Sequence, residues 1–92
     1  MFLHVGSDVT VSLRQVVAIL NYRTSQVGEA TREFLEAYRK ANKVTDLSGG
    51  DPRSVVVTDS GIYLSPISSL TLQKRADFLR RHVLLDLEEK SS

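Results

Sequence analysis

The chain contains no cysteine, which excludes disulfide bridges, thiolate metal sites and cysteine nucleophiles. Histidine is nearly as scarce, because only His4 and His82 are present, far apart and without acidic residues at the spacing of metal ligands. None of the serines lies in a nucleophile-elbow pattern. We therefore predict that the protein is not an enzyme and that it has no catalytic residue, metal site, cofactor or small-molecule substrate.

Long apolar runs and a strong excess of charge are also missing. The longest apolar run, Val16 to Leu20, is far too short to cross a bilayer. The N-terminus lacks the basic region and long apolar core of a signal peptide. These absences predict a cytoplasmic protein that does not bind a membrane. The formal net charge is only +1, so a general attraction to polyanions is not expected.

A length of 92 residues predicts a single domain, which we assign to residues 1–85, followed by a short polar tail at 86–92. The apolar fraction of 41% and the charged fraction of 25% are typical of a globular protein. A chain of this size buries only about 60–65% of the surface of its unfolded form. Self-association would therefore add stability to a marginal core.

Residues 54–65 have the pattern of a β-hairpin. The β-branched run Val55 to Val57 and the run Ile62 to Leu64 predict two strands. Asp59, Ser60 and Gly61 lie between them, and Gly61 can adopt the positive φ that a tight turn requires. Pro66 ends the second strand because it has no N–H to donate.

Two helices are predicted, at about 25–42 and 69–83. The first has this apolar face: Val27, Ala30, Phe34, Ala37, Tyr38 and Ala41. Ser68 or Ser69 is suited to cap the second helix. Its buried face is predicted from three- and four-residue spacing: Leu72, Ala76, Leu79 and Val83.

The first twenty residues predict two or three strands, at 2–5, 9–12 and 16–20, joined as a meander. The third of these has the continuous apolar character of a strand buried on both faces. Residues 44–52 are predicted to be a loop, and the glycines at 49 and 50 are more typical of a flexible turn than of a nucleotide site. The expected fold is therefore α+β, with a small, mostly antiparallel sheet packed against two helices.

The densest basic cluster lies on the second predicted helix. Its members are Lys74, Arg75, Arg80 and Arg81, and only Asp77 opposes them. They can form an ordinary solvated helix face or a surface that binds phosphate. At about 100° per residue Arg75 points away from Lys74 and Arg81, so one helix alone binds phosphate weakly. Repetition of such contacts in a ring of subunits would strengthen binding.

A second unusual feature is the aliphatic group near the C-terminus, Val83, Leu84, Leu85 and Leu87. Four aliphatic side chains within five residues cannot all lie on one side of a helix. They are predicted either to pack in an interface with another subunit or to fold onto the core of their own chain.

The run from Val55 to Ala76, VVVTDSGIYLSPISSLTLQKRA, resembles the RemA/RemB-like family of small bacterial extracellular-matrix regulators, and most closely its RemB-like branch. The N-terminal run HVGSDVTVSLRQVVAIL resembles the same branch, so the likeness covers about residues 1–80. RemA-type members are DNA-binding activators of biofilm-matrix genes that assemble into rings. The resemblance implies a non-enzymatic, homo-oligomeric DNA-binding transcriptional regulator; the alternative is a protein-interaction or assembly module without DNA binding.

The resemblance also places the candidate DNA contacts. In RemA-type members the loop before the corresponding strand carries paired arginines implicated in DNA binding, whereas this chain has Gly50 and Asp51 there. Arg53 keeps a positive charge beside the strand, and Arg14 lies close to another basic position of the relatives. Arg14 is equally suited to a phosphate contact or to a salt bridge between subunits. The predicted DNA-binding residues, which contact mainly phosphates, are Arg14, Arg53, Lys74 and Arg75.

Overall fold

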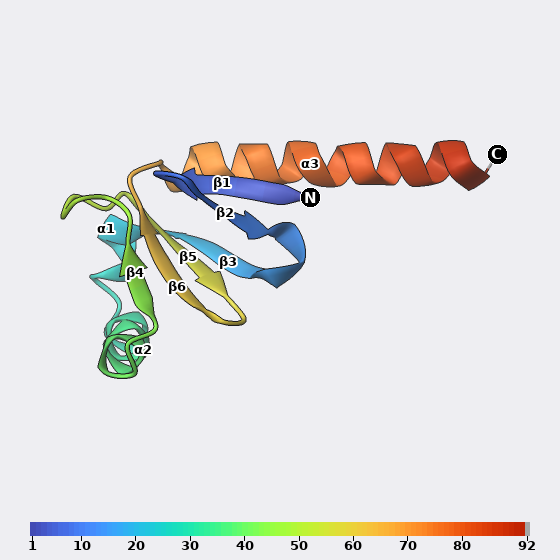
Figure 1. The fold of residues 1–92 in the computed structure, drawn as a ribbon. Coiled ribbons are helices and arrows are strands. Elements are labelled where there is room, and N and C mark those ends of the chain that lie inside the picture. The colour runs from blue at the N-terminus through green and yellow to red at the C-terminus, as the bar shows by residue number, and fades with distance from the viewer. Residues whose placement is uncertain (92) are drawn as a thin grey trace.

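The computed structural model describes the backbone of residues 1–91 and the side chains of residues 1–82, in an α+β arrangement as predicted (Figure 1). The elements in chain order are β1 (Phe2–Gly6), β2 (Val9–Ser12), the 3-10 helix η1 (Leu13–Gln15), β3 (Val16–Asn21), α1 (Tyr22–Ser25), α2 (Glu29–Lys40), β4 (Val44–Asp46), β5 (Ser54–Thr58), β6 (Gly61–Ser65) and α3 (Ser69–Ser91).

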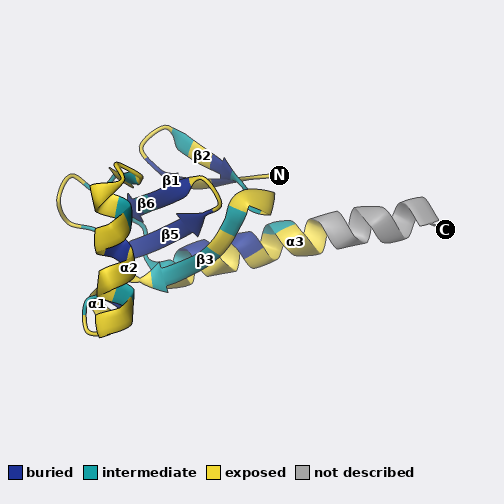
Figure 2. Ribbon diagram, turned by 90° about the horizontal axis from the view of Figure 1, so that it is seen from below, coloured by how far each residue is buried: buried dark blue, intermediate teal, exposed yellow. Residues whose placement is uncertain are grey.

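The central sheet has four strands in the order β3-β5-β6-β4. The β3–β5 and β5–β6 pairs are antiparallel, and β4 joins the far edge parallel to β6. Every residue of β5 is buried, because both faces of the sheet are covered (Figure 2). Successive side chains of a strand point to opposite faces, so Val56 enters one core cluster while Val55 and Val57 enter another.

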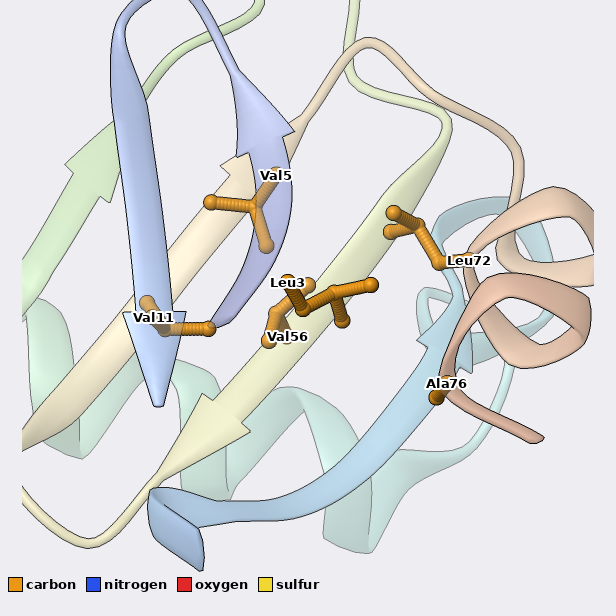
Figure 3. Packing of buried hydrophobic residues seen from close by; sticks show 6 residues of the cluster. All are labelled: Leu3, Val5, Val11, Val56, Leu72 and Ala76. Carbon is orange, nitrogen blue, oxygen red and sulfur yellow. The ribbon is translucent and has the colours of Figure 1, made fainter. Parts of the chain in front are cut away.

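The β1–β2 ribbon and α3 cover the first face of the sheet. Figure 3 shows their side chains converging on one cluster, whose buried members are Leu3, Val5, Val11, Val56, Leu72 and Ala76. The predicted inner face of the second helix is confirmed at Leu72 and Ala76, and Leu79 is half-buried. The fourth predicted member, Val83, lies beyond the described side chains.

Helix α2 covers the second face, and here two details of the prediction are wrong. The helix expected at 25–42 begins only at Glu29, as α2, and a turn at 26–28 separates it from the short α1. The expected apolar face is also largely exposed, since Val27 is 82% exposed and Phe34 is exposed as well. The residue buried against the sheet is Leu35, 3% exposed, with Tyr38 packed beside it. An alanine-rich stripe offers less apolar area to the sheet than one leucine and one tyrosine.

The N-terminal strands differ from the predicted meander. β1 and β2 form a separate antiparallel ribbon, while β3 pairs with β5. β3 is an edge strand and is not buried on both faces, because Val17 is 70% exposed. Its apolar run was an ambiguous signal, since periodicity alone does not distinguish a central strand from an edge that a helix partly covers.

The predicted loop at 44–52 contains a strand, β4. The Ile62 N–H donates to the Lys43 carbonyl (2.8 Å) and brings this segment against β6. A Cβ at Gly61 would lie 2.9 Å from that same carbonyl oxygen, so the glycine permits the approach of β4. The positive φ predicted for Gly61 is confirmed, at 156°. Gly61 nevertheless pairs with Thr58 as the first residue of β6, so Asp59 and Ser60 form the turn.

The hairpin and the start of α3 agree with the sequence prediction. β6 ends at Ser65, directly before Pro66. The Ser68 hydroxyl accepts the Thr71 N–H (3.2 Å) and caps α3. Farther along the helix, the Gln73 side chain donates to the Ile19 carbonyl (3.1 Å) and joins α3 to the exposed edge of β3. No helix in the described part of the chain is both long enough and apolar enough to cross a membrane.

Candidate nucleic-acid interface

The predicted DNA-binding residues are all exposed, but the fold distributes them over three places. Arg14 lies in η1, where the Asp59 N–H donates to the neighbouring Gln15 carbonyl (3.0 Å). Arg14 is thus beside the turn of the β5–β6 hairpin. Arg53 precedes the opposite end of β5, about 20 Å from Asp59 at the rise of an extended strand. One protomer therefore does not bring Arg14 and Arg53 to the same point.

Lys74 and Arg75 lie on α3, facing β1. They line a hollow of about 460 Å³ together with largely apolar neighbours, namely Phe2, Leu3, His4, Phe78 and Leu79. The two phenylalanines are well exposed, at 69% for Phe2 and 60% for Phe78. This hollow combines two cations with aromatic surface.

Arg80, also on α3, has a carboxylate partner. Its guanidinium lies 3.7 Å from the Asp77 carboxylate, with both side chains largely exposed. Such an ion pair contributes little to stability, typically under about 1 kcal/mol, but it lowers the positive charge available on that side of the helix. The effective cations of α3 in the described part are Lys74, Arg75 and Arg81.

Arg53 shares a second, larger hollow with Arg23, an arginine that was not among the predicted DNA-binding residues. The hollow has a volume of about 780 Å³ and lies at the end of the sheet where β3 stops and β5 begins. Its lining is mainly polar: Asn21, Tyr22, Arg23, Gln26, Gly50, Asp51, Pro52, Arg53 and Ser68.

Backbone hydrogen bonds position both arginines. The Tyr22 N–H donates to the Arg53 carbonyl (3.0 Å), and the Arg53 N–H donates to the Ser65 carbonyl (2.8 Å). Asn21 caps α1 by accepting the Thr24 N–H (3.2 Å) on its side chain. The segments that carry Arg23 and Arg53 are therefore joined directly to each other and to the end of the central sheet.

A signal for Arg23 was present in the sequence. Arg23 follows β3 closely and Arg53 immediately precedes β5, so antiparallel pairing of these strands makes the two residues neighbours. The predicted meander assigned β3 to the wrong partner, and the relation between the two arginines was lost with it.

The loop that enters this hollow begins with a defined turn at Asp46. The Ser48 hydroxyl and the Ser48 N–H (2.8 Å) both donate to the Asp46 carboxylate. These bonds, the hydroxyl first, lower the pKa of Asp46, and smaller contributions come from the Gly50 N–H and from the charge of Arg39. The turn leads the chain into Gly50 and Asp51, which line the same hollow as Arg53.

The histidines have structural contacts. His4 donates a ring N–H to the Ser7 carbonyl (2.7 Å), and the His82 ring packs edge-on against Phe78, with centroids 4.3 Å apart. No group of three metal-ligating side chains comes together among the described residues.

Comparison with known proteins connects this architecture to a family. The family model described as extracellular matrix regulatory protein A-like matches residues 2–76, which include both core clusters and the Arg23–Arg53 hollow. The chain belongs to the RemA-like family. It is also similar to extracellular matrix regulatory protein B of Bacillus subtilis (strain 168), with 40% identity over 79 residues, 86% of this chain and 94% of that protein.

Membership of the RemA-like family confirms the resemblance inferred from the sequence, including its RemB-like character. The matched region ends at Ala76, so it contains Arg14, Arg53, Lys74 and Arg75. The predicted interface residues Val83, Leu84, Leu85 and Leu87 lie outside both the matched region and the described side chains.

Proposed function

We propose that the chain is a homo-oligomeric, DNA-binding transcriptional regulator of extracellular-matrix genes, the genes of biofilm formation. Family membership supports a regulatory role in place of catalysis. One structural observation carries the DNA-binding part. No carboxylate of residues 1–82 lies within 4.0 Å of the side-chain nitrogens of Arg14, Arg53, Lys74 or Arg75. These cations are exposed, and no ion pair within residues 1–82 neutralises their charge.

The distribution of these cations favours an assembly over a monomer. A single protomer presents three small basic sites in different places, and each would contact few phosphates. An array of subunits repeats every site, and many weak contacts on one array add to a high affinity. The contacts would be mainly to phosphates, which position a protein on DNA without reading its sequence.

Exposed apolar surface supports self-association. Phe2 and Phe78 border the hollow on α3, and Val17 is exposed on the edge strand β3. An exposed edge strand also carries backbone groups that can pair with another chain.

The test is an anisotropy titration with fluorescent duplex DNA at two salt concentrations, together with light scattering on the same sample. We expect a mass several times 10.3 kDa and an affinity that falls as salt rises. Log affinity falls as log salt rises, and Arg53→Ala should make this fall less steep, by about 0.9 for each phosphate contact that is lost per protomer. Arg32→Ala, an exposed arginine on α2, is the matched control and should leave the slope unchanged.

The second candidate is an assembly or protein-interaction module without DNA binding. It is favoured by Asp51, an acid beside Arg53, and by the apolar character of the hollow on α3. Oligomerisation without any DNA binding at ~50 mM salt would select this candidate.

A further inference from the structure

The hollow between α1 and the start of β5 contains two arginines from segments thirty residues apart in the chain. Arg23 and Arg53 both line it, and no carboxylate of residues 1–82 lies within 4.0 Å of either guanidinium. Both guanidinium groups are exposed, and two cations that line one concave surface favour the binding of an anion there.

The neighbouring groups are suited to the same anion. Asn21 and Gln26 carry side-chain amides, whose N–H groups can donate hydrogen bonds to the oxygen atoms of an anion. A guanidinium has a planar set of N–H donors that matches the oxygens of a phosphate. The volume of about 780 Å³ lies in the range of sites that hold a nucleotide-sized ligand.

We propose that Arg23 and Arg53 together form a phosphate-binding site, with the amides of Asn21 and Gln26 as additional donors. The hydrogen bond from Tyr22 N–H to the Arg53 carbonyl keeps the two segments in register, so the site is organised before the ligand arrives. Arg23 thereby supplies a second positive charge at a place where the neighbouring loop residues, Gly50 and Asp51, supply none.

Asp51 also lines the hollow and opposes this function in part. Its carboxylate repels a phosphate and reduces the favourable field of the two arginines. We therefore expect the site of one protomer to bind phosphate weakly. Removal of the Asp51 charge should strengthen this binding.

The phosphate can come from two sources. For a phosphate of the DNA backbone, the inference rests on the proposed function and identifies Arg23 as a further contact. For the phosphate of a small molecule, the site would bind a phosphorylated ligand independently of DNA.

The experiment is an NMR titration of the isotope-labelled full chain at low salt, using adenosine 5′-monophosphate, adenosine and a short DNA duplex as separate probes. The side-chain amide signals of Asn21 and Gln26 report on the hollow. Gln73 is the internal control, because its amide is bound to Ile19 outside the site. The monophosphate should shift the first two signals and leave Gln73 in place, whereas adenosine should shift none.

The variants should give a defined order of affinity for the monophosphate. Arg23→Ala and Arg53→Ala should each weaken binding about fivefold, as expected for one exposed charged contact, while Asp51→Asn should strengthen it. Arg32→Ala on α2 should have no effect. Arg23→Gln keeps the aliphatic stem and replaces Arg23→Ala if that variant does not give a folded spectrum.

The titration with the DNA duplex distinguishes the phosphate site from the proposed DNA-binding function. If the monophosphate shifts the reporter amides but the duplex binds nowhere, the phosphate site stands and the proposed DNA-binding function fails. If the duplex binds while the reporters stay in place and Arg23→Ala is neutral, the function stands and the phosphate site is wrong. Reporter amides that respond to neither probe also overturn the site.

Discussion

The two faces of the central sheet are covered to very different depths. On the first face, β1, β2, β5 and α3 all contribute buried side chains to one cluster (Figure 3). On the second face α2 contributes a single buried residue, Leu35, and most of its surface is exposed (Figure 2). α3 and the β1–β2 ribbon therefore contribute most to the stability of the fold, while α2 lies more loosely on the sheet and is expected to open more readily.

The largest effect should come from truncation of the leucine on each face. Leu72→Ala should lower the free energy of unfolding by about 3–5 kcal/mol, because it leaves a cavity among elements from both ends of the chain. Leu35→Ala should cost less, about 2 kcal/mol, because α2 can relax toward the sheet. Urea denaturation of both variants measures the difference. Equal losses would contradict the contrast between the two faces.

A smaller loss is expected at Ser65, a fully buried serine on the end of β6. Its hydroxyl donates to the Val5 carbonyl and accepts the Ile67 N–H (3.0 Å), so it joins the ribbon, the sheet and the turn before α3. Ser65→Ala leaves both backbone groups without this partner and should cost about 1–3 kcal/mol. Thermal unfolding measures the loss. Ser60→Ala, in the exposed hairpin turn, is the control and should be close to neutral.

Changes at the helix caps should alter the free energy of unfolding by a still smaller amount. α3 begins with a capping side chain, Ser68, whereas α2 begins at Gly28 with no side-chain cap. Ser68→Ala should destabilise by about 1 kcal/mol, while Gly28→Ser should stabilise by a few tenths of a kcal/mol. A Cβ at Gly28 meets only ordinary contacts, the nearest being Thr31 Oγ1 at 3.5 Å. Chemical denaturation of the two variants tests the pair, and a destabilising Gly28→Ser would show that α2 needs its glycine.

The smallest expected effect is a loss of stability of the Asp46–Ser48 turn as the pH falls. The pKa of Asp46 is lowered in the folded state, so the Asp46–Ser48 turn contributes its stability above the unfolded pKa of about 3.9. That contribution is lost as the pH falls through the lower, folded pKa. Amide exchange of Ser48, followed by NMR from pH 6 downward, should show the turn opening only below about pH 4. Asp46→Asn should remove this acid step, and an unchanged profile in that variant would exclude Asp46 as its origin.

The β5–β6 hairpin, its end at Pro66, the Ser68 cap and the inner face of α3 could be predicted from the sequence alone. Each of these depends on local chemistry, such as β-branched strand residues, a missing N–H or three- and four-residue spacing. The family was also recognisable from the same stretch.

The pairing of the strands and the contacts between distant side chains depend on the tertiary structure. Val44 to Asp46 becomes a strand because β6 offers it a partner, and Leu35 becomes the buried residue of α2 because the sheet lies on that side. Arg23 and Arg53 become neighbours through the pairing of β3 with β5. Strand pairing joins residues far apart in the chain through backbone hydrogen bonds, which carry no signature in the side chains that the sequence records.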